Sequence, residues 1–115
     1  MTKLKIGGLA IALGLFSGVA SAQLSTTFTA VGETIGQVDV IENGNVLVID
    51  ANGGGWGAPG CPTAFFVQLT PALTGYSEML ATILTARAAE LPVRFSGTCR
   101  ASNAAFFDVD RVRLQ

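Results

Sequence analysis

The chain contains no histidine among its 115 residues, and only 13% of its residues are charged. Histidine is the commonest general base and metal ligand near neutral pH. Its absence excludes Ser-His-Asp and Cys-His catalytic sites, together with zinc sites that use imidazole. We therefore expect a protein that is not an enzyme and that holds no metal and no cofactor.

Lysine is also scarce, because it occurs only at positions 3 and 5, where it begins the pattern of a secretory signal peptide. An apolar run over residues 6–16 follows, and Ala20-Ser21-Ala22 has the small residues that a signal peptidase requires. The run is shorter than the ~20 residues of a membrane-spanning helix. The sequence thus predicts a signal peptide over residues 1–22, a secreted or periplasmic location, no stable membrane anchor after cleavage, and one domain over residues 23–115.

Removal of both lysines leaves five arginines against eight acidic residues, and five minus eight gives a net charge of −3 for the mature chain. A nucleic-acid partner needs a basic stripe that neutralises phosphates. The sequence offers no such stripe beyond Arg111 and Arg113, so we expect no nucleic-acid binding.

Cysteine occurs only twice, at Cys61 and Cys99. Export places both residues in an oxidising compartment, where pairing is expected. A metal or redox site is the alternative, but the spacing is not that of a CxxC motif and histidine is absent. The sequence therefore predicts one disulfide, which supplies covalent support that a domain of this size needs.

Strand-forming residues dominate the first half of the mature chain. The Asn43-Gly44 pair predicts a tight hairpin between strands over residues 35–42 and 45–51, because Asn and Gly tolerate positive φ angles. The β-prone segment 25–31 is expected to extend the first of these strands across a bulge near one of two glycines, Gly32 or Gly36.

The second half of the chain predicts three further strands and one helix. The strands are expected over residues 63–69, 93–96 and 105–114, with Cys99 in the turn between the last two. The helix is expected from about Gly75 to the residues before Pro92, with Thr74 as its N-cap. Its apolar stripe is Tyr76, Met79, Leu80, Ile83, Leu84 and Arg87.

In the last strand, Val112 and Leu114 are expected to face the core, with the arginines in solvent and a bulge near Asp108. Five strands with one helix between the third and the fourth is the layout of the OB-fold, a small Greek-key barrel whose helix plugs one end. The sequence therefore predicts a mainly β fold with one helix, arranged as an OB-fold-like five-stranded barrel.

Four segments resemble a family of small exported bacterial proteins that are similar in layout to the B subunit of subtilase cytotoxin and to other toxin B subunits. They are the helix over residues 76–88, Leu91-Pro92-Val93-Arg94-Phe95, Gly97-Thr98-Cys99, and the closing Val109-Asp110-Arg111-Val112-Arg113-Leu114. The resemblance implies rings of five copies that bind sialylated glycans. None of the sugar-binding residues of those subunits has a clear match in this sequence.

Oxygen-rich stretches are weak candidates for cation binding. Asp108 and Asp110 lie two apart on one expected strand face, but they are expected to be solvated or to pair with Arg111 or Arg113. Residues 50–55 read Asp-Ala-Asn-Gly-Gly-Gly, which lacks the spacing and the terminal Glu of an EF-hand loop. Residues 53–57 are not a phosphate loop, because no Lys or Ser/Thr follows at the required spacing.

A glycine-dense loop over residues 52–60 carries the only tryptophan, Trp56. An exposed indole there can stack on a sugar ring or insert into a partner. Alternatively, the indole folds back and caps the barrel near Cys61. The predicted binding residues are Asn52, Gly55, Trp56 and Gly57.

Together these features predict a secreted or periplasmic, non-catalytic binding module for a glycan or a protein, acting through the open barrel face and the loop around Trp56. The alternative is an accessory or structural envelope protein that contacts a protein partner and binds no small molecule. Assembly separates the two hypotheses, since a homo-oligomeric ring favours the first and a strict monomer favours the second.

Overall fold

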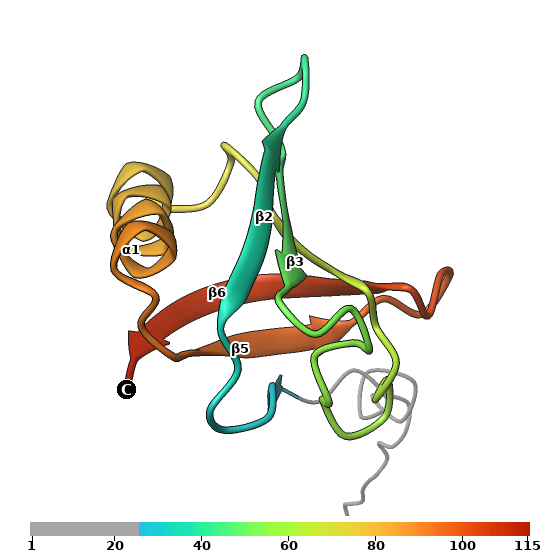
Figure 1. Cartoon of the computed structure of the whole chain (residues 1–115). Coiled ribbons are helices and arrows are strands. Elements are labelled where there is room, and N and C mark those ends of the chain that lie inside the picture. Colours follow the sequence, from blue (N-terminus) through green and yellow to red (C-terminus); the bar gives the residue numbers. More distant parts are fainter. Residues whose placement is uncertain (1–25) are drawn as a thin grey trace, which may run out of the picture.

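The structure is a computed structural model that describes residues 26–115, which form a six-stranded sheet and one helix (Figure 1). This architecture confirms the prediction of a mainly β fold with one helix. The predicted signal peptide, residues 1–22, lies outside the described residues. The elements are β1 (Thr27–Phe28), β2 (Ile35–Val40), β3 (Val46–Asp50), β4 (Phe66–Leu69), α1 (Tyr76–Ala89), β5 (Val93–Cys99) and β6 (Phe106–Leu114).

The sheet curls on itself because two consecutive strands occupy its two ends. The strand order is β1-β5-β6-β4-β3-β2, with β4 and β6 parallel and all other neighbours antiparallel. The link between β1 and β2 passes Glu33, whose carbonyl oxygen accepts a hydrogen bond from the Val93 amide at 2.8 Å. Figure 1 shows the β2–β3 hairpin standing steeply across the β5–β6 pair, so the sheet is barrel-like. Strand β1 is a sixth strand beside the predicted five.

The β2–β3 hairpin forms around Asn43-Gly44 as predicted, with Val40 opposite Val46. Gly44 has a φ of 87°, which explains why glycine occupies this turn. The register shifts between Ile35 and Gln37, so a bulge lies at Gly36 as predicted, but the segment 25–31 does not extend β2 across it: β1 pairs with β5 at the other end of the sheet, so that prediction is wrong. A Cβ atom at Gly36 would lie 2.8 Å from the Cα atom of Ala51, and the close approach of the two strands therefore requires glycine.

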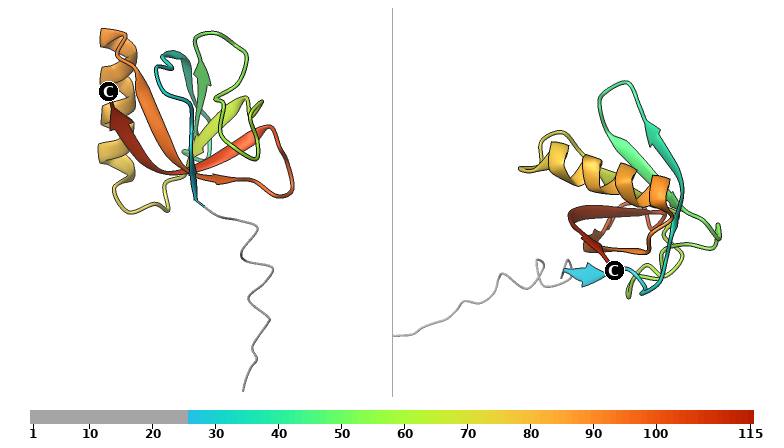
Figure 2. Two further views of the ribbon diagram at one scale, coloured as in Figure 1. Left: turned by 90° about the horizontal axis from the view of Figure 1, so that it is seen from below. Right: turned by 60° about the vertical axis from the view of Figure 1, so that its left-hand side comes forward.

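Helix α1 lies beside the hairpin and packs against β2 and β6 (Figure 2). Its N-cap is Gly75, with a φ of 81° and no side-chain hydrogen bond, so the prediction of Thr74 as N-cap is wrong. Instead, the Tyr76 hydroxyl donates to the carbonyl oxygen of Gly44 at 2.6 Å and ties the first turn to the hairpin. The predicted stripe is wrong at Leu84, whose side chain is exposed, whereas Ala86 is buried beside Ile83.

Strand β5 is longer than predicted, and Cys99 is its last residue rather than part of a turn. Its register with β6 shifts between Ser96 and Gly97, which leaves Asp110 as the extra residue of a bulge. This position agrees with the bulge predicted near Asp108. A Cβ atom at Gly97 would collide with the carbonyl oxygen of Asp108, so this bulge depends on glycine.

The bulge resets the alternation of side chains in the last third of β6. Val112 packs against the core as predicted, but Leu114 is 42% exposed, so its predicted core position is wrong. The shared strand face predicted for Asp108 and Asp110 depended on unbroken alternation, which the bulge interrupts.

Cys61 and Cys99 form the predicted disulfide. Cys61 belongs to the buried apolar core, and Cys99 packs against that core. A disulfide indicates an oxidising, non-cytoplasmic environment. Within residues 26–115, the helix is too short and too polar to cross a membrane.

Candidate functional site

Trp56 is fully buried. Of the two placements considered for its indole, the structure shows the one that folds back onto the barrel and not the exposed one. The indole Nε1 donates to the carbonyl oxygen of Val48 at 3.1 Å. Its ring meets the Phe95 ring edge to face, with centroids 5.1 Å apart. Trp56 is therefore a core side chain in this structure, and its ring face is not open to a ligand.

The two glycines beside Trp56 are explained by packing. Gly55 has a φ of 103°, and a Cβ atom there would lie 2.9 Å from the Cα atom of Thr63. Gly57 has a φ of 72°, and its Cβ atom would lie 2.9 Å from the Cβ atom of Ala30. Both positions therefore require glycine for the loop to fold over the core. Asn52 is exposed.

Three phenylalanine rings form a cluster outside the apolar core. Phe65 and Phe66 meet edge to face at 4.9 Å, and Phe66 stacks on Phe106 at 5.0 Å with an interplanar angle of 29°. Phe65 is 36% exposed, and the other two are partly exposed. We call these rings, with the side chains of Arg100 and Asp108 beside them, the aromatic face.

The pairing of the strands explains why these rings meet. Phe66 of β4 lies opposite Phe106 of β6 and opposite Ile49 of β3, so the three side chains share one side of the sheet. The buried neighbours Val67 and Phe107 point to the other side, into the core. The aromatic face is therefore the outer surface of the β3-β4-β6 part of the sheet.

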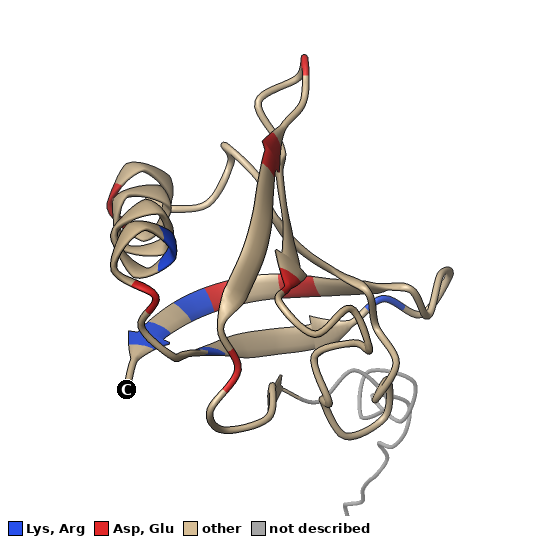
Figure 3. Cartoon of the chain, viewed as in Figure 1, with Lys and Arg blue, Asp and Glu red and all other residues tan. Residues whose placement is uncertain are grey.

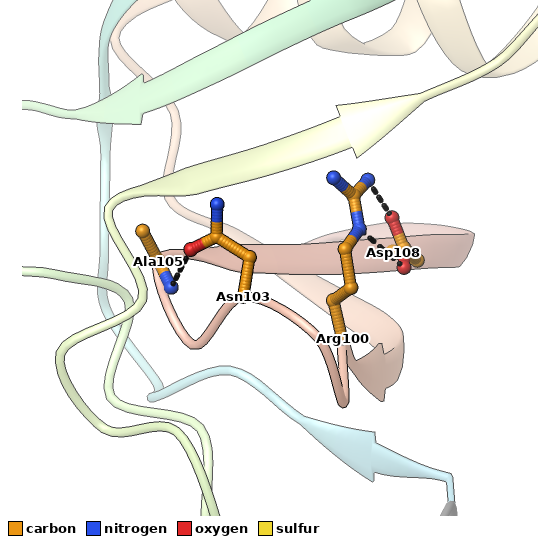
Figure 4. A network of polar contacts seen from close by, with 4 residues as sticks. All are labelled: Arg100, Asn103, Ala105 and Asp108. Carbon is orange, nitrogen blue, oxygen red and sulfur yellow. Dashed lines mark hydrogen bonds and ion pairs between the residues drawn. The ribbon is translucent and has the colours of Figure 1, made fainter.

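Arg100 and Asp108 form the polar edge of the aromatic face (Figure 4). The guanidinium donates twice to the carboxylate, from Nη2 to Oδ1 at 2.6 Å and from Nε to Oδ2 at 3.2 Å. The hydrogen bond to Asp108 is the main cause that raises the pKa of Arg100, against the opposing effect of burial. The guanidinium carbon also lies 4.3 Å from the Phe106 ring centroid. Asp108 was predicted to be solvated or to pair with Arg111 or Arg113, and its partner is Arg100 instead.

A short turn between β5 and β6 holds Arg100 in place. Asn103 closes this turn, because its Oδ1 accepts from the Ala105 amide at 3.1 Å and its own amide donates to the carbonyl oxygen of Arg100 at 3.3 Å (Figure 4). The turn follows Cys99 directly, so the disulfide anchors the polar edge of the aromatic face to the glycine-rich loop.

A second surface carries arginines without acidic partners. Arg94 lies opposite Arg113, and Ser96 lies opposite both Phe28 and Arg111. The guanidinium carbons of Arg94 and Arg113 lie 5.0 and 6.0 Å from the Phe28 ring centroid. Within residues 26–115 the ion pair of Arg100 is the only one, so these three arginines form none. Figure 3 shows positive segments gathered near the C-terminal end of β6, and we call this surface the arginine face.

The sequence analysis missed the aromatic face because it treated the phenylalanines only as strand formers. Adjacent phenylalanines occur twice, at Phe65-Phe66 and Phe106-Phe107. Neighbouring side chains in a strand point to opposite sides, so a doublet in a sheet with one buried side places one ring outside the core. The two doublets in the sequence therefore indicated that one ring of each lies outside the core. They did not indicate that these rings meet, because the contact depends on the pairing of β4 with β6.

Comparison of the chain with protein-family models, with curated proteins and with solved structures finds no match.

Proposed function

We propose that the domain is an OB-fold barrel. The five longer strands are ordered β2-β3-β4-β6-β5 in the sheet, and the helix connects β4 to β5, which are the third and fourth of them along the chain. The hydrogen bond between Val93 and Glu33 joins the two ends of that series. A closed Greek-key arrangement of five strands with one helix in this position is the description of the OB-fold.

We further propose that this is a secreted or periplasmic, non-catalytic binding module whose ligand is a glycan bound at the aromatic face. The observation that supports this most directly is the position of three phenylalanine rings outside the core, beside an Arg100–Asp108 pair. OB barrels bind oligosaccharides on their second and third strands and the adjoining loops. Here those strands are β3 and β4, and the turn at Arg100 adjoins them through β6.

The chemistry of the aromatic face suits a sugar. Sugar rings present apolar C–H surfaces that pack on aromatic rings, and their hydroxyl groups need both donors and acceptors. Arg100 supplies donors, while Asp108 and its neighbour across the strands, Gln68, supply acceptors. The face thus combines a stacking surface with polar groups that orient a ligand.

Substitution of the rings tests this proposal. On a glycan array, Phe66→Ala and Phe106→Ala are each expected to weaken binding by roughly 5- to 150-fold, because each removes a stacking surface worth roughly 1–3 kcal/mol. Phe28→Ala is the matched control, since it removes an exposed ring from the arginine face instead. Equal binding by all three folded variants, verified by circular dichroism, would count against a glycan site here.

The arginine face supports a second candidate function, the binding of an acidic protein partner without any small ligand. Unpaired arginines around an exposed ring are well suited to carboxylates of a partner. The double variant Arg94→Gln/Arg113→Gln is expected to lose several-fold in capture from envelope extracts, and the wild-type interaction is expected to weaken as salt rises. Arg87→Gln on α1 is the control. If capture of the partner changes neither with salt nor in the double variant, the arginine face is not the binding surface.

Ring assembly remains a proposal from the resemblance to toxin B subunits. Light scattering of the mature protein is expected to give five times the monomer mass if such a ring forms. A monomer at micromolar concentrations would favour the accessory protein over the ring-forming module.

A further inference from the structure

Glu33 and Asp50 are neighbours where the segment before β2 pairs with the end of β3, because Ile35 lies opposite Asp50 and the Ala51 amide donates to the carbonyl oxygen of Thr34. Asp50 is only 2% exposed, and its Oδ2 is buried without a hydrogen-bond partner. Oε1 of Glu33 is also buried without a partner. Buried carboxylate oxygens without a donor are costly, so this pair favours a proton or a cation between the two groups.

The side chain of Asn52 reaches the same place. Its amide group donates a hydrogen bond to the Glu33 carboxyl group, and the main-chain amide of Gly55 donates to Oδ1 of Asp50 at 3.4 Å. Rotation of the Asn52 amide by half a turn would present its Oδ1 atom at the same position.

We propose that Glu33, Asp50 and Asn52 form a calcium-binding site. Within residues 26–115 no three His, Cys, Asp or Glu side chains gather around one point, so amide and main-chain oxygens must complete the coordination. The Asp-Ala-Asn-Gly-Gly-Gly segment lacks a terminal Glu in sequence, and the fold supplies Glu33 from the segment that pairs with the end of β3.

The donor set favours calcium over other cations. All donors are oxygens, which suit a hard cation, and a glycine-rich loop accommodates the variable geometry of Ca²⁺ better than the strict octahedron of Mg²⁺. Only two carboxylates contribute charge, so the expected dissociation constant lies in the range of about 10⁻⁴–10⁻³ M typical of extracellular modules. The disulfide already indicates a non-cytoplasmic environment, where calcium at that level is available.

The ionisation of Glu33 agrees with this geometry. Burial, then the charge of Asp50, then a hydrogen bond shared with Asp50 raise the pKa of Glu33, while the Asn52 amide acts in the opposite direction. A divalent cation between the two carboxylates would offset the repulsion between their charges.

The test uses the purified exported protein with calcium chloride, magnesium chloride or a chelator. Calcium at 10 mM is expected to raise the Tm by roughly 5–10 °C over the chelator, and magnesium by much less. Terbium bound at the site is expected to luminesce when Trp56 is excited, because Trp56 directly follows Gly55, whose amide contacts Asp50. Glu33→Gln, at a half-buried position, should abolish both effects without unfolding the domain, and Asp50→Asn should do the same.

Glu42→Gln is the matched control, because it removes an exposed carboxylate of the hairpin outside this site. Equal Tm values in calcium and chelator, without terbium luminescence, would overturn the proposal. A second result would also overturn it: stability that falls equally in calcium and in chelator as the pH rises through the raised pKa of Glu33. That result would show that Glu33 and Asp50 share a proton and do not bind an ion. In that case Glu33→Gln would remove the pH dependence in either solution.

Discussion

Trp56→Ala is expected to lower the free energy of unfolding by about 3–5 kcal/mol, the usual cost of removing a large buried ring. The substitution empties a site bordered by Phe95 and leaves the carbonyl oxygen of Val48 without its indole donor. The main-chain hydrogen bonds at this position, from the Trp56 amide to Ala64 and from the Ala30 amide to the Trp56 carbonyl oxygen, remain available to alanine, so the expected loss comes from the indole. Urea denaturation followed by circular dichroism measures the effect.

Trp56→Phe separates packing from hydrogen bonding if the alanine variant does not fold. Phenylalanine retains most of the ring but no donor, so a loss of about 1–3 kcal/mol is expected. The wild-type indole should also emit at short wavelength and resist quenching by iodide, because it is fully buried. A strongly quenched, long-wavelength emission would contradict the inward placement and would return Trp56 to the candidates for ligand stacking.

Removal of the disulfide by Cys61→Ala/Cys99→Ala is expected to cost about 4 kcal/mol, from the entropy of a closed loop of 38 residues. Small domains have only about 5–15 kcal/mol of net stability. The Tm should therefore fall by more than roughly 15 °C in a domain of this size. Differential scanning calorimetry of the wild-type protein with and without reductant provides the same comparison without mutation.

The disulfide should also affect ligand binding. Cys99 directly precedes Arg100, so its loss frees the turn that positions the Arg100–Asp108 pair. Below its own unfolding transition, the double variant is expected to bind glycans more weakly than the wild type while Phe66 and Phe106 remain in place.

The stability prediction has its own contradicting outcome. Unchanged calorimetric stability after complete reduction, verified by mass spectrometry of alkylated thiols, would show that the disulfide contributes little to stability.

Short-range signals predicted the elements well. Asn43-Gly44 predicted the hairpin because its two residues accept the dihedral angles of the turn without any help from the rest of the chain. The apolar spacing after Gly75 predicted the helix for a similar reason, although Leu84 shows that spacing alone did not define the face that packs. The pairing of Cys61 with Cys99 followed from there being only two cysteines and an expected export route.

Contacts between distant segments decided the sites. Trp56 had two placements open to it, and the cavity beside Phe95 selected one of them. The bulge at Asp110 reset the alternation of β6 and exposed Leu114. A one-residue shift moves every following side chain to the other side of a strand, so small register differences that leave the sequence pattern unchanged alter the surface.

The sequence by itself determined the strands, the helix, the disulfide and the mainly β class, because each depends on residue type, local spacing or cysteine number. Only the tertiary structure decided which side chains meet: Phe66 with Phe106, Arg100 with Asp108, and Glu33 with Asp50. These pairs arise from strand pairing and from the close approach of the link before β2 to the end of β3. Such contacts depend on the relative positions of whole strands, which local residue preferences do not specify.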